Sequence, residues 1–284
     1  MTRVFSILLL FLSPFRAFSQ DAAAKPETEK LNLDEFPGEI VEKVVIPVPA
    51  EVFAVLDKMD EPNWAGQIRI PEDGARPKTD RVLLAFEFGS FVAEGFVAVQ
   101  AGHVDEIKTI GGRALKLGNA LGLGDAVEPH SKSIVEAAEA GDWKRVRSEL
   151  DLTQATVRKT MERLRDDDLG SLSSLGGWVR GTHALTSLIS ENYSRDKAEL
   201  LNQPDLVQHF IDAIDGMSEP VKTHADVVAV RAGLSKIHEH LAAAATGTEI
   251  SAETVSAIGQ ICENLLRRYY FPPAAAAPPE AADN

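Results

Sequence analysis

The stretch from Arg81 to Ala101, RVLLAFEFGSFVAEGFVAVQA, constrains the fold most strongly, because as a helix it is apolar around most of its circumference. A helix of this kind belongs either in the middle of a protein or in a membrane. Its length suffices for a bilayer, but the two carboxylates of Glu87 and Glu94 would be costly on one side of a membrane helix. We therefore expect a core helix against which the other helices pack.

The two acids define a line on the surface of this helix. Glu87 and Glu94 are seven residues apart, which is close to two helical turns, so they lie on the same side. In one interpretation the line belongs to a buried site, where burial raises the pKa of a carboxyl group and makes it chemically useful. In the other, the line faces a water-filled seam or pairs with an arginine of a neighbouring helix.

A second unusual helix is expected over residues 171–192. It contains Gly176, Gly177 and Gly181, and each glycine in a helix interior costs about 1 kcal/mol relative to alanine. Three such costs indicate that another helix or a ligand approaches this backbone closely. Arg180 on this helix is the partner we expect for the acid line, because a buried carboxylate requires one.

These two helices together supply the candidate ligand-binding site. It lies at their seam and consists of Glu87, Glu94, Trp178, Arg180 and His183.

A loop rich in proline and glycine, roughly residues 60–79, is the expected lid of the seam. A connection of that length is uncommon in a compact domain and is usually functional. Trp64 within it is interpreted either as an anchor that pins the loop or as an exposed binding aromatic, and anchoring is favoured because large aromatic side chains seek burial.

The remaining pattern predicts an all-α protein, an irregular helical bundle or array of about ten helices with one short extended segment near the N-terminus. The extended segment is EIVEKVVIPV, residues 39–48, and we expect it to lie on the helices as an arm, because one strand cannot make a sheet. Further along, Ser133 and Glu136 have the spacing of a capping box, which predicts a helix start at Ser133.

The expected organisation has four parts, with one domain between terminal segments. They are a signal peptide over residues 1–19, a flexible arm over 20–36, an all-α domain over 37–271 and a disordered proline- and alanine-rich tail over 272–284. The alternative divides the domain into two helical subdomains near residues 125–130.

The first residues have the pattern of a secretory signal peptide. Arg3 is followed by the apolar run VFSILLLFL, and Ala17 and Ser19 stand at the −3 and −1 positions of a cleavage before Gln20. We therefore expect a periplasmic or secreted protein with no transmembrane segment after removal of the signal. Cys262 is the only cysteine, so an intramolecular disulfide is excluded, and its apolar neighbours predict a buried, inert thiol.

Charge and motifs exclude several classes of function. The formal net charge of −14 disfavours nucleic acid as a partner. No Glu-x-x-His or His-Glu-x-x-His motif is present, and His238 and His240 would point in different directions on a helix, so we expect no dedicated metal and no cofactor. Ser194 and Lys197 match Ser-x-x-Lys without its companion motifs, and we assign no catalytic residue.

From these observations we expect a non-catalytic helical binding or interaction protein whose ligand is a small molecule or a protein partner. One alternative is a scaffold or assembly factor that uses its acidic surface. The other is an enzyme with Glu94 as acid or base and with Arg180 or His183 holding an anion.

Overall fold

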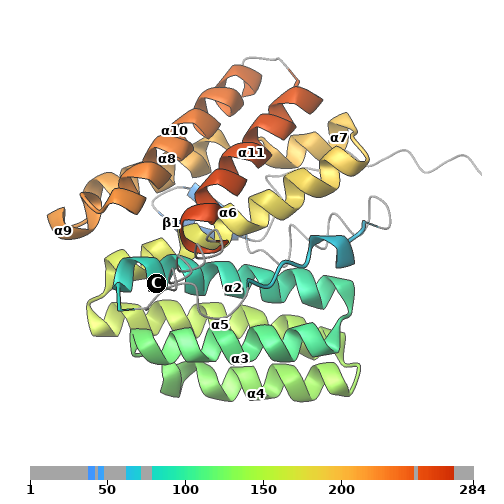
Figure 1. The fold of residues 1–284 in the computed structure, drawn as a ribbon, viewed down its shortest axis with the longest axis vertical. Coiled ribbons are helices and arrows are strands. Elements are labelled where there is room, and N and C mark those ends of the chain that lie inside the picture. Colours follow the sequence, from blue (N-terminus) through green and yellow to red (C-terminus); the bar gives the residue numbers. More distant parts are fainter. Residues whose placement is uncertain (1–37, 42–43, 48–61, 72–78, 246–248, 272–284) are drawn as a thin grey trace, which may run out of the picture. The chain divides into compact units, whose positions relative to one another are not determined.

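The computed structural model describes residues 38–41, 44–47, 62–71, 79–245 and 249–271. These residues confirm the predicted all-α fold, which Figure 1 shows as an array of helices. The elements are β1 (Gly38–Val41), β2 (Val44–Pro47), η2 (Ala65–Gln67), α2 (Arg81–Ala101), α3 (Val104–Leu121), α4 (Gly124–Glu139), α5 (Trp143–Leu164), α6 (Asp167–Glu191), α7 (Arg195–Ala198), η3 (Glu199–Leu201), α8 (Pro204–Gly216), α9 (Glu219–Lys222), α10 (Ala225–Ala245) and α11 (Ala252–Tyr269). The signal peptide, the arm of residues 20–36 and the tail of residues 272–284 lie outside the described residues.

The extended segment is a hairpin of two strands and not the single strand we expected. β1 and β2 pair antiparallel, with Val41 opposite Val44 and Gly38 opposite Pro47. The register leaves two residues between the strands, which is the length of a tight hairpin connection. Those two residues are Glu42 and Lys43, so the sequence lacks the Asn-Gly or Asp-Gly signal by which such a turn is recognised.

α2 has the core position that its sequence predicts. All residues from Leu84 to Phe91 are buried, and α3 and α6 both pack against the helix. Within the described part of the chain, α2 is the helix whose length and composition would also suit a membrane, and 89% of that apolar stretch is buried inside the protein. Asp80 begins the helix by accepting a hydrogen bond from the backbone N–H of Val82 at 2.9 Å.

The glycines of α6 allow it to contact α2 backbone to backbone. A Cβ atom at Gly89 of α2 would lie 1.7 Å from the carbonyl oxygen of Ser173, and one at Gly176 would lie 2.2 Å from a carbonyl oxygen of α2. At Gly177 the nearest atom would be the carbonyl oxygen of Gly89 at 3.2 Å, whereas at Gly181 no atom of the described residues lies within 4 Å. The expected close approach of another helix is therefore confirmed at Gly176 and Gly177, and no described helix makes it at Gly181.

α4 begins nine residues before the predicted capping box, so that prediction is wrong. The helix runs from Gly124 to Glu139 and contains Pro129 in its interior. Ser133 does not cap a helix, because its hydroxyl donates to Glu149 Oε1 on α5 at 3.0 Å. A serine and a glutamate three residues apart are also compatible with a helix interior when the hydroxyl finds a partner on a neighbouring helix.

The later helices cover the other side of α6. α11 packs against α6 and α10, and α10 packs against α8 (Figure 1). Cys262 of α11 is fully buried, and burial raises the pKa of its thiol to about 12, which confirms the predicted inert cysteine.

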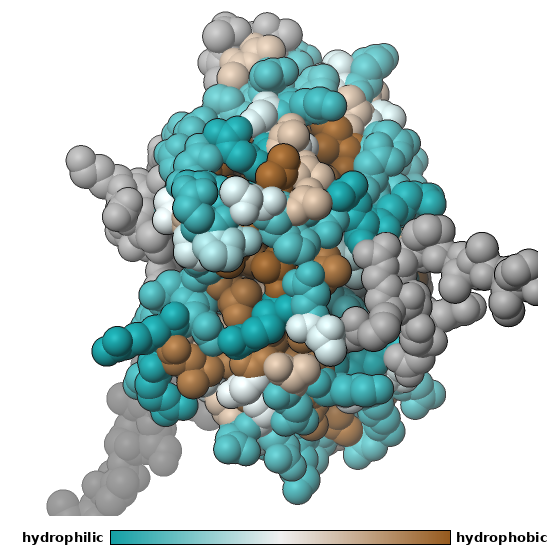
Figure 2. All heavy atoms as spheres, turned by 60° about the vertical axis from the view of Figure 1, so that its left-hand side comes forward, coloured by the Kyte–Doolittle hydropathy of each residue, from teal (hydrophilic) through white to brown (hydrophobic). Residues whose placement is uncertain are grey.

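Figure 2 shows a face on which hydrophilic residues surround hydrophobic ones gathered near its middle. Among the described residues, the large hydrophobic side chains that are more than a third exposed are Leu152 and Leu164 of α5, Tyr193 after α6 and Val228 of α10.

Candidate functional site

The centre of the seam is an ion pair between α2 and α6. The Nε of Arg180 lies 2.6 Å from Oε2 of Glu94, and both side chains are completely buried. The predicted partnership between Arg180 and the acid line is therefore confirmed for Glu94. Removing two charges from water is costly, so such a pair persists only when further hydrogen bonds satisfy its remaining polar atoms.

Those further hydrogen bonds come from residues 62–71, which we call the strap. The strap lies against α2 and α6, and Trp64 near its start is only 4% exposed, so the anchoring interpretation of this residue is confirmed. Trp64 lies within a short turn, in which Asn63 Oδ1 accepts a hydrogen bond from the N–H of Gly66 at 3.1 Å. Pro71 at the other end accepts a hydrogen bond from Arg113 of α3 through its carbonyl oxygen.

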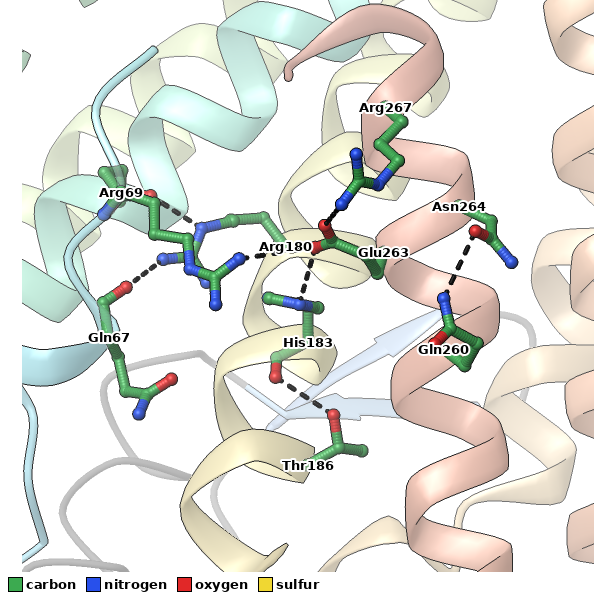
Figure 3. Close-up of polar contacts among 10 residues, drawn as sticks. Gln67, Arg69, Arg180, His183, Thr186, Gln260, Glu263, Asn264 and Arg267 are labelled. Atoms are coloured by element: carbon green, nitrogen blue, oxygen red, sulfur yellow. Dashed lines mark hydrogen bonds and ion pairs between the residues drawn. The ribbon is translucent and has the colours of Figure 1, made fainter. Parts of the chain in front are cut away.

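The ion pair binds the backbone of the strap. The N–H of Arg69 donates to Glu94 Oε1 at 2.6 Å, and Nη2 of Arg180 donates to the carbonyl oxygen of Gln67 at 2.5 Å. Figure 3 shows Arg180 extending from α6 towards the segment that carries Gln67 and Arg69. The carboxylate and the guanidinium thus hold a donor and an acceptor of the same short stretch of main chain.

Tyr270, just after α11, completes the surroundings of Glu94. Its hydroxyl lies 3.1 Å from Glu94 Oε2 and 3.3 Å from the carbonyl oxygen of Arg69, and its ring packs edge-on against Phe91. Burial, and then the negative charges of Glu94 and Glu87, raise the pKa of Tyr270 well above its usual value. The phenol therefore stays protonated and acts as a hydrogen-bond donor.

A second carboxylate, Glu263 of α11, lies at the outer edge of the site. Its Oε2 lies 2.9 Å from Nε2 of His183 and 3.5 Å from Nη1 of Arg69, and its Oε1 lies 2.8 Å from Nη2 of Arg267 (Figure 3). Burial, followed by the positive charge of Arg180, lowers the pKa of His183 to about 4, against the opposing effect of Glu263. His183 is therefore neutral near pH 7 and donates its Nε2–H to Glu263.

Two buried atoms of the site have no hydrogen-bond partner among the described residues. They are Nη1 of Arg180, which is a donor, and Nδ1 of His183, which in this tautomer is an acceptor. The two residues are one helical turn apart on α6 and so share a face. Buried polar atoms are nearly always paired, so these two are exceptions within the described part of the site.

The structure brings three of the five predicted residues together. Glu94, Arg180 and His183 belong to one connected cluster, and Glu87 is buried on the same side of α2, with 8% exposure. Trp178 instead packs against Phe210 of α8, with ring centroids 5.5 Å apart. It is two residues from Arg180, and side chains at that spacing point to different sides of a helix.

Five residues of the cluster were not predicted from the sequence. Gln67 and Arg69 contribute backbone groups, which every residue carries and which no side-chain pattern reveals. Tyr270 had a weak signal, because a buried tyrosine requires a partner for its hydroxyl. Glu263 and Arg267 show the spacing of a helix ion pair, which identifies a pair but not its position in the fold.

The arrangement is suited to holding a polypeptide backbone more than to moving protons. Glu94 accepts hydrogen bonds from Arg69, Arg180 and Tyr270, so both of its oxygens are occupied. Within the described ranges, no three histidine, cysteine, aspartate or glutamate side chains are grouped so that they could hold a metal ion.

Comparisons with family models, with curated protein sequences and with solved structures found no match to this chain. Inference about its function therefore depends on the geometry of the site itself.

Proposed function

We propose that this chain is an exported, non-catalytic interaction protein that binds its ligand at the seam between α2 and α6. The observation that carries the proposal is the contact between the Glu94 carboxylate and the strap: the carboxylate accepts two hydrogen bonds from side chains and one from the backbone of the strap. A general acid or base needs an oxygen that can reach a substrate. Glu94 instead uses Oε1 to hold a backbone N–H, which favours the binding of a polypeptide over catalysis.

The two buried polar atoms that have no hydrogen-bond partner among the described residues support a ligand at this position. Nη1 of Arg180 and Nδ1 of His183 supply an unused donor and an unused acceptor in a buried place. A small polar ligand or a peptide group that accepts from the first atom and donates to the second would satisfy both. Export is proposed from the pattern of residues 1–19.

Native mass spectrometry of the full chain, purified gently from its own source, tests the proposal. The expected result is a discrete adduct on the native chain that is absent from the Arg180→Met variant. Arg231→Met is the matched control, because Arg231 makes an ion pair with Asp215 on the surface, away from the seam. A bare chain in all three samples would contradict the proposal and favour a scaffold that works through its acidic surface.

A further inference from the structure

The strap is bound in the way that a peptide ligand is bound. Arg180 donates to one backbone carbonyl, Glu94 accepts from one backbone N–H, and Tyr270 reaches a second carbonyl, all within Gln67 to Arg69. Backbone groups are the same in every polypeptide. The cluster would therefore make these three contacts with any chain that adopts the same path.

Two acids add a preference for particular side chains. Nε2 of Gln67 donates to Glu191 at the end of α6 at 2.8 Å, and Arg69 lies 3.5 Å from Glu263. A carboxylate accepts from amide and cationic side chains and repels acidic ones. The site therefore favours an amide or a base at the first of these positions and a base at the second.

The strap does not provide a hydrogen-bond partner for every buried polar atom of this cluster. Nη1 of Arg180 and Nδ1 of His183 remain without a partner among the residues that the structure describes. A carbonyl group would satisfy the first atom and an N–H group would satisfy the second. The strap side chain that faces Glu263 is also weakly held, because Arg69 is 46% exposed and its ion pair is long, at 3.5 Å.

We propose that the surface formed by Glu94, Arg180, Tyr270 and Glu263 binds an extended, basic peptide segment of a partner protein in place of residues 67–69. This inference rests on the proposed function and specifies its ligand. The charge of the chain agrees with it, because a protein of net charge −14 attracts a basic partner and speeds the encounter with it. The strap then acts as a built-in competitor that the partner displaces.

The test measures whether a free peptide binds when the strap is weakened in the full chain. Arg69→Pro removes both the N–H that reaches Glu94 and the guanidinium that reaches Glu263. The probe is a fluorescent peptide with the sequence of residues 62–71, PNWAGQIRIP, followed by fluorescence anisotropy. We expect it to bind the variant at least about tenfold more tightly than the native chain, whose own strap competes.

Two controls define the site. Changing Arg69→Glu in the peptide is expected to weaken its binding to the variant about tenfold or more, because its carboxylate would face Glu263. Adding Tyr270→Phe to the variant chain is expected to weaken the original peptide several-fold, because one backbone contact is lost. Arg69→Ala, which keeps the backbone N–H, is the second strap variant and should bind the peptide with intermediate affinity.

Three results would overturn the inference. The first is a folded Arg69→Pro chain that does not bind the peptide. The second is equal binding of the basic and acidic peptides. The third is failure of both strap variants to fold, which would make the strap a fixed part of the core. Any of these results together with an adduct in native mass spectrometry would leave the proposed function standing and remove only the peptide as its ligand.

Discussion

At the scale of single residues, the buried ion pair has the largest expected effect. Arg180→Met leaves the carboxylate of Glu94 buried without its cation, and breaking such a pair costs about 3–5 kcal/mol. We expect the free energy of unfolding, measured by denaturant titration, to fall by that amount. Arg231→Met is the control, because its exposed pair with Asp215 should contribute at most about 1 kcal/mol. Equal stabilities for the two variants would show that the pair does not stabilise the fold.

Tyr270→Phe removes a single O–H donor, which lies within reach of both Glu94 and the carbonyl oxygen of Arg69. The ring contact with Phe91 is kept and only the hydroxyl is lost, so we expect a loss of about 1.5–3 kcal/mol, typical of a hydrogen bond to a charged group. Tyr193→Phe makes the identical change at a partly exposed hydroxyl that donates to the carbonyl oxygen of Ile250 at 2.8 Å. Its expected loss is smaller, at about 1 kcal/mol. Thermal unfolding of both variants checks the order, and a larger loss at Tyr193 would contradict it.

At the scale of elements, the glycines determine how closely α2 and α6 approach. Gly89→Ala places a Cβ atom 1.7 Å from a carbonyl oxygen of α6, so the helices must move apart, at a cost of about 1–3 kcal/mol. Gly181→Ala is the matched control on α6, because nothing lies within 4 Å of its Cβ position. That change should stabilise the protein by about 0.5–1 kcal/mol. Melting temperatures that shift in the same direction would contradict the close approach.

The same helices show what the sequence could reveal and what it could not. The apolar surface of α2 and the glycines of α6 predict that the helices are central and that one approaches the other, because periodicity and glycine costs are local properties. The pairing of Glu94 with Arg180 followed from the need of a buried charge for a partner. The loop of residues 60–79 was expected at the seam, but the contacts of the strap within it did not follow, since they are made by backbone groups and by residues far apart in the chain. The β1–β2 hairpin was missed because Glu42 and Lys43 carry no turn signal.

At the scale of the whole molecule, the cluster links stability to pH. His183 has its pKa lowered to about 4 in the folded state against 6.5 in the unfolded chain, so between these values the unfolded chain binds more protons. The contribution of neutral His183 is therefore complete above about pH 6.5 and is lost as the pH falls towards 4. His183→Gln keeps a side-chain donor near Glu263 but does not titrate, so it should lose about 2 kcal/mol less than the native chain between pH 7 and pH 4.5. Parallel stability curves for the two proteins, measured by denaturant titration, would contradict this linkage.

Hydrogen–deuterium exchange measures how firmly Glu94, Arg180 and Tyr270 hold the strap, because their backbone contacts run to Gln67 and Arg69. In the native chain we expect the amide of Arg69 to exchange slowly, since it donates to a buried carboxylate at 2.6 Å. In Tyr270→Phe the strap should exchange faster, while α3 serves as an internal reference and stays unchanged. A strap that already exchanges in the native chain as fast as an unprotected peptide would contradict the account.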